Sequence, residues 1–206
     1  MFSPCIDPGH GGRGWEPVFN LSMALLLRTA LVEKHPEWDI EMTRELDLIN
    51  PSRPARAEIA MMHNAQFTLS IHANASPTGD PREHGPLWFY KDEVGPEKQI
   101  GKTILDALFG SGLMPRGEYI EEGTGRVRPM KGNMHQARPV GWTRRSYSVL
   151  RHHGSRPAGL LECDYYTNPK ARAWLESMEG KKQLVVAMIA GLETAEGLLV
   201  PKGPTP

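Results

Sequence analysis

The hydrophobic and polar positions of this chain form strand-like and helix-like patterns in turn along its length. Short apolar runs bounded by turn residues indicate buried strands. Apolar residues that recur every three or four positions indicate helices packed on one face. The predicted strands span residues 2–6, 38–43, 67–72, 87–90 and 158–163. The predicted helices span residues 16–32, with Pro17 in the first turn, then 55–64, 100–109, 169–176 and a stretch that begins after Gly180 and ends near Leu199. This alternation predicts an α/β sandwich.

The length of 206 residues fits one domain with a sizeable core. No internal repeat interrupts the pattern, and residues 115–142 are its least regular part, rich in Gly, Arg and Pro. We therefore expect a single domain over residues 1–200, followed by a loose tail over residues 201–206.

Composition and charge exclude several classes of protein. Lys plus Arg and Asp plus Glu number 24 each, so a net charge of zero gives no reason to expect a nucleic-acid partner. No apolar run is long enough to span a membrane. Met1 leads directly into the first predicted strand without a secretory signal, so we expect synthesis in a cytoplasm and either another export route or a trimmed chain. Cys5 and Cys163 stand alone in strand-like runs and are expected to be buried free thiols.

One histidine stands between glycines just after the first predicted strand, in the stretch Ile-Asp-Pro-Gly-His-Gly-Gly over residues 6–12. Glycines let a loop approach a ligand closely, and ligands of open α/β sheets bind beyond the carboxyl ends of strands. His10 is therefore a candidate metal ligand, although a turn that merely contains a polar residue fits this stretch equally well.

Other polar residues occupy comparable places. His72 follows a strand end, Glu162 ends or nearly ends another strand, and Glu16 opens the first helix a short loop after His10. Two histidines and one carboxylate, with a fourth position left open, are typical of catalytic zinc sites. Zinc lowers the pKa of bound water to about 7, and a carboxylate outside the ligand set then transfers the proton. The sequence offers two carboxylates, one for each role.

Simpler interpretations of these residues stay open at this point. Glu16 also fits a helix N-terminal carboxylate that the helix dipole stabilises, and His72 fits a hydrogen-bonded histidine at a strand end. Glu162 is harder to explain this way, because an ionised carboxylate beside a buried run needs a partner. The remaining histidines lie in loops or on helix surfaces and are expected to be solvated: His35, His63, His84, His135, His152 and His153.

Five motifs follow one another along the chain, namely the stretch 6–12, Glu16 with Asn20-Leu21, Thr43-Arg44, the stretch 70–74 and the stretch 157–162 with Thr167-Asn168-Pro169. Their order and spacing resemble those of the zinc-dependent N-acetylmuramoyl-L-alanine amidases of the third amidase type. The match extends from residue 2 to about residue 198.

The resemblance implies a Rossmann-like, mostly parallel sheet flanked by helices on both faces. It also implies that residues 1–200 form a zinc amidase catalytic domain, which cleaves the amide between N-acetylmuramic acid and L-alanine in peptidoglycan. Residue by residue, it assigns one zinc ion to His10, Glu16 and His72, and the general base to Glu162. We interpret Asn74 and Arg44 as supporting rather than catalytic residues, and we expect a monomer.

Two departures from the family pattern change details of the expected site. Family members have a longer loop before the ligand glutamate, whereas only residues 11–15 separate His10 from Glu16, which predicts a more open rim. Residues 163–166 replace the usual glycine-phenylalanine run. Asp164 therefore lies two residues after Glu162, where it would face the same cleft and favour a protonated partner.

Two alternative functions remain. One is a zinc carboxypeptidase-like amidohydrolase, in which Arg145 or Arg151 would bind a terminal carboxylate. The other is an inactive cell-wall-binding module, which loss of His10, His72 or Glu162 would indicate, and all three are present. A phage-type lysin and the trimmed core of a larger enzyme fit the sequence equally well.

Overall fold

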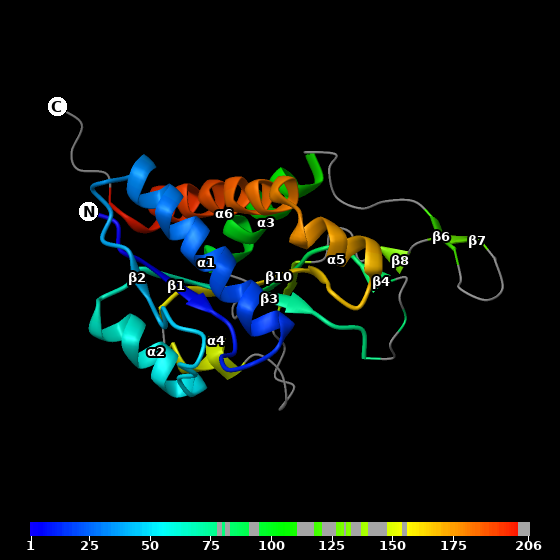
Figure 1. The fold of residues 1–206 in the computed structure, drawn as a ribbon. Coiled ribbons are helices and arrows are strands. Elements are labelled where there is room, and N and C mark those ends of the chain that lie inside the picture. Colours follow the sequence, from blue (N-terminus) through cyan, green and yellow to red (C-terminus); the bar gives the residue numbers. More distant parts are fainter. Residues whose placement is uncertain are drawn as a thin grey trace.

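A six-stranded sheet in the order β2-β1-β3-β10-β5-β9 forms the middle layer of the computed structural model (Figure 1). Four neighbouring strands are parallel, namely β2 (Glu41–Met42), β1 (Pro4–Pro8), β3 (Phe67–Asn74) and β10 (Ala158–Tyr165). β5 (Leu87–Tyr90) is antiparallel to β10, and β9 (Ala137–Pro139) is parallel to β5. The predicted mostly parallel α/β sheet is thereby confirmed.

The structure describes residues 1–77, 80, 83–90, 95–110, 118–120, 127–129, 131–132, 137–139, 148–153 and 156–201. Two short ribbons lie outside the main sheet. β4 (Glu83–His84) pairs with β8 (Lys131–Gly132), and β6 (Glu118–Ile120) pairs with β7 (Val127–Pro129). Most of the predicted loose tail lies outside the described residues. None of the described helices is long and apolar enough to span a membrane.

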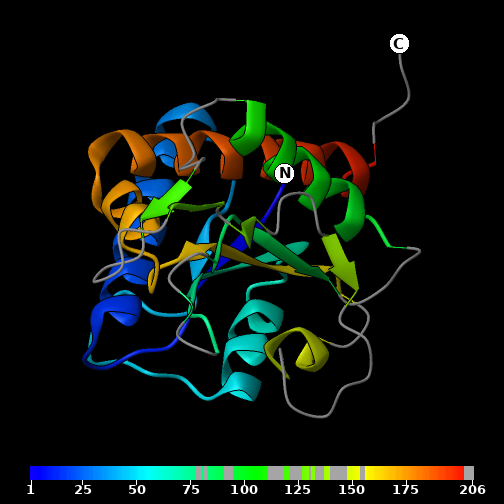
Figure 2. The same cartoon turned by 90° about the vertical axis from the view of Figure 1, so that its right-hand side faces the viewer.

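Helices cover both faces of the sheet (Figure 2). α1 (Trp15–Lys34), α3 (Glu97–Gly110) and α6 (Met178–Leu199) lie together on one face, and α2 (Arg53–Met62) and α4 (Ser148–His152) lie on the other. The short helix α5 (Pro169–Glu176) connects β10 to α6. The three-layer arrangement agrees with the sandwich that the alternating pattern predicts.

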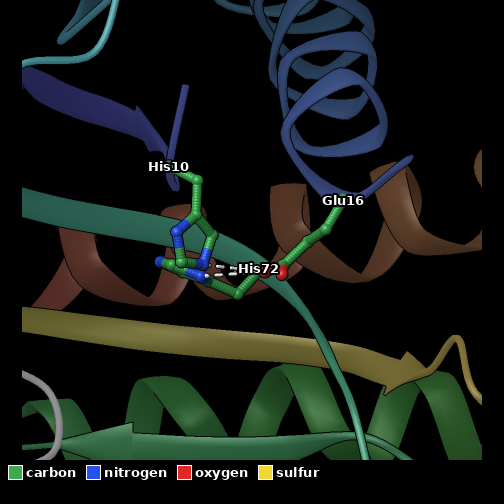
Figure 3. A group of neighbouring side chains, drawn as sticks. All are labelled: His10, Glu16 and His72. Atoms are coloured by element: carbon green, nitrogen blue, oxygen red, sulfur yellow. Dashed lines mark hydrogen bonds and ion pairs between the residues drawn. The ribbon is translucent and has the colours of Figure 1, made fainter. Parts of the chain in front are cut away.

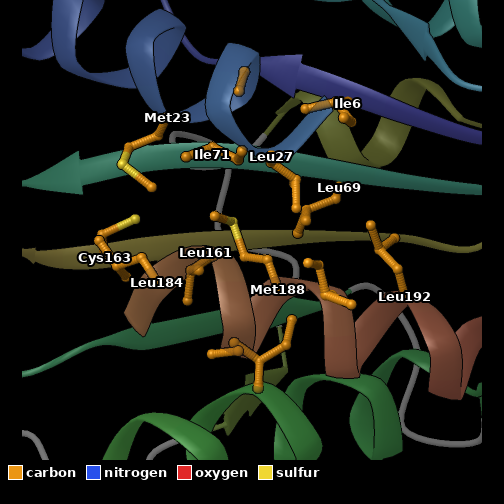
Figure 4. Packing of buried hydrophobic residues seen from close by; sticks show 14 of the residues in the cluster. Ile6, Met23, Leu27, Leu69, Ile71, Leu161, Cys163, Leu184, Met188 and Leu192 are labelled. Atoms are coloured by element: carbon orange, nitrogen blue, oxygen red, sulfur yellow. The ribbon is translucent and has the colours of Figure 1, made fainter. Parts of the chain in front are cut away.

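The main core lies between the sheet and the layer of α1 and α6 (Figure 4). Alternate residues of β3 and β10 point into this core, including Leu69, Ile71, Leu161 and Cys163, all fully buried. Because side chains alternate along a strand, His72 and Glu162 lie on the opposite face of the sheet from this core. Both cysteines are buried free thiols, as predicted.

Several predicted element boundaries differ from the structure by a few residues, and two of these differences have a clear physical cause. The strand expected over residues 38–43 is reduced to β2, because Trp38 turns away to stack on His35 and to donate a hydrogen bond to Glu196 at 3.0 Å. Gly180 lies inside α6 rather than before it, because the Ser177 side chain accepts a hydrogen bond from the Gly180 N–H and begins the helix earlier.

The expectation that the remaining histidines are solvated is wrong for three of them. His84 and His153 are buried, and His35 is largely covered by Trp38 and paired with Glu193 at 2.9 Å. The sequence places these histidines in loops or on helix surfaces, but His35 contacts Glu193 of α6 and His153 lies 3.4 Å from the Thr68 hydroxyl of β3, which the local pattern does not reveal. His135 lies outside the described residues.

Candidate metal centre

Three adjacent parallel strands end at one edge of the sheet and bring the candidate residues together. Pro8 of β1 pairs with Ile71 of β3, so His10 follows β1 beside the end of β3. Glu162 of β10 pairs with His72 of β3 across the next strand boundary. The carboxyl ends of these strands therefore deliver His10, His72 and Glu162 to the same region.

His10, Glu16 and His72 converge on a single point (Figure 3). One ligand atom from each residue lies within 4.8 Å of the others. Glu16 Oε1 is 3.2 Å from His10 Nε2 and 3.3 Å from His72 Nδ1. The two imidazole rings lie edge to face, with centroids 4.8 Å apart. Two imidazole nitrogens and one carboxylate oxygen are a donor set that catalytic zinc uses, so the three residues fit this metal.

Glu16 reaches this point although only five residues separate it from His10. It lies in the first turn of α1, and its Oε1 is also 3.4 Å from the Ala73 N–H and from Asn20 Nδ2, one helical turn further on. Burial opposes ionisation, but the hydrogen bonds and charges of His10 and His72 outweigh it and lower the pKa of Glu16 to about 2. The carboxylate is therefore ionised at neutral pH, as a metal ligand must be.

His72 is held close to the loop backbone. Burial lowers the pKa of His72, but the hydrogen bond to Glu16 and the nearby carboxylates outweigh it, so the pKa is raised overall. The ring lies against Gly9, where a Cβ would come within 2.2 Å of its Cε1 and Nε2 atoms. Only glycine fits at this position, which explains one of the glycines in the sequence motif.

Glu162 lies beside the three converging residues without joining them. Its side chain is buried, with the residue 7% exposed, and Oε2 has no hydrogen-bond partner among the described residues. Burial, aided by the charge of Glu16 and opposed by His72 and His10, raises the pKa of Glu162 to about 7. A carboxyl group that titrates near neutral pH is suited to accept and return a proton.

Asp164 follows Glu162, but a bulge in β10 separates their surroundings. The pairing of β10 with β3 shifts by one residue between Glu162 and Tyr165. Asp164 Oδ1 accepts hydrogen bonds at 2.7 Å from the N–H groups of Gly85 and Tyr165. Burial is the main reason that the pKa of Asp164 is raised to about 7, and the two backbone hydrogen bonds only partly oppose it.

The two residues interpreted as supporting ones have different surroundings. Arg44 is buried and donates to the carbonyl oxygens of Pro8, Gly9 and Pro17, which ties the His10 loop to the start of α1. The Asn74 side chain accepts a hydrogen bond from the next residue's N–H at 2.8 Å. Its carbonyl accepts another from Tyr166, so Asn74 shapes the strand end.

One buried interaction beside the site is not evident from the sequence. Asp7 and Arg56 form a buried ion pair of 2.6 Å directly behind the His10 loop. Asp7 belongs to the motif around His10, and a charged residue in a buried strand signals a partner. The sequence gives no sign that this partner is an arginine 49 positions away on α2.

The chain is 26% identical to the probable N-acetylmuramoyl-L-alanine amidase AmiB of Haemophilus influenzae, with 91% of this chain and 50% of AmiB covered. It thus spans about half the length of this curated relative.

Solved structures share the fold. The catalytic domain of CwlV from Bacillus (Paenibacillus) polymyxa var. colistinus aligns with a TM-score of 0.71 and 23% identity, covering 98% of this chain and 100% of that one. The amidase from Clostridium difficile 630 aligns with a TM-score of 0.71 and 24% identity, covering 98% of each chain.

A profile of the N-acetylmuramoyl-L-alanine amidase family matches residues 5–194, which includes every element of the site described above. The chain therefore belongs to the N-acetylmuramoyl-L-alanine amidase family of the third type, as the order of its motifs predicts.

Proposed function

We propose that this protein hydrolyses the amide bond between the lactyl group of N-acetylmuramic acid and L-alanine in peptidoglycan, with one zinc ion held by His10, Glu16 and His72. The convergence of these three ligand atoms beside the buried Glu162 carboxyl group, whose Oε2 has no hydrogen-bond partner among the described residues, carries the proposal. Membership of the amidase family supports the choice of bond and substrate.

The three side chains suit a catalytic rather than a structural zinc site, because they leave one coordination position for water or substrate. When bound, zinc would make water a stronger acid and polarise the carbonyl group of the substrate. The ionised state of Glu16 favours binding of the cation. The side chain of His10 is 52% exposed, so the site is open on that side, in line with the short loop before Glu16.

Glu162 is proposed as the general base that transfers the proton. Its Oε2 atom is buried without a hydrogen-bond partner among the described residues and is therefore available to accept a proton from the attacking water. The same carboxyl group would return that proton to the departing nitrogen of L-alanine, which makes the amine a good leaving group. The raised pKa of Glu162 places both steps near neutral pH.

The alternative functions receive less support. For a carboxypeptidase, Arg145 lies outside the described residues, and Arg151 is exposed on α4. For an inactive binding module, a site residue should be missing, yet the proposed ligands and base are all present. Because peptidoglycan is the proposed substrate, we also propose that the protein acts on the cell wall or in the periplasm. We further propose that it acts as a monomer.

The products of peptidoglycan digestion test this proposal. Purified cell walls treated with the zinc-loaded protein should release stem peptides with free L-alanine amino termini, which dinitrophenyl labelling and mass spectrometry identify. The Glu162→Gln protein serves as the control. New reducing sugar ends, or cleavage only within the stem peptide, would contradict the proposed bond specificity.

A further inference from the structure

Three successive carbonyl groups of the His10 loop are held by two buried arginines. Pro8 O accepts from Arg44 Nε at 3.0 Å and from Arg56 Nη1 at 2.9 Å. Gly9 O accepts from Arg44 Nη2 at 3.1 Å, and His10 O accepts from Arg56 Nη2 at 2.5 Å. Hydrogen bonds from a charged group are stronger than neutral ones, particularly in a buried setting, so these contacts fix the course of the loop.

Arg56 is itself fixed by a fully engaged carboxylate. Asp7 Oδ1 accepts from Arg56 Nη1 at 2.6 Å and from Thr43 Oγ1 at 2.5 Å, and Oδ2 accepts from Ser70 at 2.6 Å. Asp7 is 1% exposed and Arg56 4% exposed. Arg56 also donates from Nε to Pro51 O at 3.1 Å. The guanidinium therefore has little freedom to turn away from His10.

His10 needs such a support more than the other proposed ligands do. Its backbone has a φ of 57°, in the left-handed region that residues with a side chain seldom adopt. Its imidazole is half exposed and contacts only Glu16 and His72 among the described ring and ion-pair partners. Because about half of the side chain is exposed, the backbone of His10 contributes much of what determines where Nε2 lies.

We infer that Arg56, held by Asp7, is a positioning residue that fixes the His10 carbonyl and thereby places the imidazole of His10 at the metal centre. The inference rests on the proposed metal function of His10. This positioning role requires the planar fork of arginine, because its three nitrogens donate hydrogen bonds to Asp7, to two loop carbonyls and to the Pro51 carbonyl at once. A lysine in this place would keep the charge beside Asp7 but lose the fork.

Metal affinity and the spectrum of bound cobalt test this inference without relying on activity. The zinc dissociation constant is measured by competition with a chromophoric chelator, and Co²⁺ absorption reports the coordination geometry. The test variant is Arg56→Lys. One control is Arg156→Lys, because Arg156 donates to Ala65 O at 3.2 Å at the far end of the strands. A second control is Leu192→Ala, which lowers stability from the core on α6.

We expect Arg56→Lys to raise the zinc dissociation constant roughly 10- to 100-fold, the usual effect of losing an outer partner of a ligand, and to alter the cobalt spectrum. Both controls should bind zinc within about threefold of the unmodified protein. Unchanged affinity and spectrum in folded Arg56→Lys would overturn the inference. An equal loss of affinity in Leu192→Ala would also overturn it, since the effect would then follow stability alone.

Should Arg56→Lys fail to fold, the double variant Asp7→Asn with Arg56→Gln replaces it. This change removes both charges, so neither is left buried and unpaired, and the same loss of zinc affinity is expected. Failure of the proposed function gives a different result, because the unmodified protein itself would then bind no zinc at the His10 site.

Discussion

The imidazole of His72 lies so close to Gly9 that no methyl group fits between them. A Cβ at Gly9 would lie 2.2 Å from the Cε1 and Nε2 atoms of His72. The backbone φ of Gly9 is not positive, so an alanine would suffer from this contact and not from its own conformation. We therefore expect Gly9→Ala to displace the His72 ring and to weaken zinc binding by about tenfold or more.

Gly12→Ala is the matched control for this substitution. Gly12 has a positive φ of 83°, but a Cβ there would meet no atom within 4 Å. Alanine at this position costs about 1 kcal/mol of backbone strain without touching either histidine. Zinc affinity, measured by chelator competition, should fall for Gly9→Ala and persist for Gly12→Ala. Equal affinities of the two variants would show that the Gly9 contact is unimportant.

Metal removal should abolish activity, and Glu16 should be necessary for restoring it. We expect a chelator to inactivate the protein. Added zinc should restore the activity once about one ion is bound per chain. Glu16→Gln removes the charge while keeping the size, so it should bind zinc at least about tenfold more weakly. Glu33→Gln, an exposed position on the same helix, should bind normally. Elemental analysis after dialysis measures the zinc content of both variants. Normal zinc content in Glu16→Gln would exclude Glu16 as a ligand.

Asp164 should make the folded protein less stable as the pH rises. Its pKa is about 7 in the folded protein and near 3.8 in the unfolded chain. Between these values the unfolded carboxyl loses its proton while the folded one keeps it. The contribution of Asp164 to the free energy of unfolding is therefore fully present below about pH 4. It declines by at most about 1.4 kcal/mol per pH unit up to about pH 7.

Asp164→Asn keeps the oxygen that accepts from Gly85 and Tyr165 but cannot ionise. Urea unfolding between pH 4 and pH 8 should show a shallower decline of stability for this variant than for the unmodified protein. The stability of Asp164→Asn relative to the unmodified protein should be greatest above pH 7. Parallel pH profiles for the two proteins would mean that Asp164 does not titrate in this window.

The sequence located the proposed site because its main residues obey simple rules. His10 follows β1, whereas His72 and Glu162 lie near the ends of β3 and β10, so parallel pairing was enough to bring them together. Glu16 followed from the start of a helix close behind His10, with the family resemblance as added support. Strand alternation also explains why Leu161 and Cys163 face the core while Glu162, between them, faces the other side of β10.

Other features depend on contacts between distant segments and could not be read from the pattern. The hydrogen bond of Arg56 to His10 joins residues 46 positions apart. The bulge after Glu162 shifts the register of β10 by one residue, which simple alternation cannot foresee and which changes the surroundings of Asp164. Trp38 reads as a strand residue but instead packs against His35 and Phe2.

We propose that Glu162 moves the proton and does not hold the metal. Glutamine at this position keeps the shape of the side chain but cannot accept a proton. The most direct test is therefore to measure zinc content, kcat and KM of Glu162→Gln on a soluble muropeptide. We predict full zinc content, little change in KM and a kcat lower by roughly 10²- to 10⁴-fold. A Glu162→Gln protein that has lost its zinc, or that still cleaves at nearly the original rate, would contradict the account.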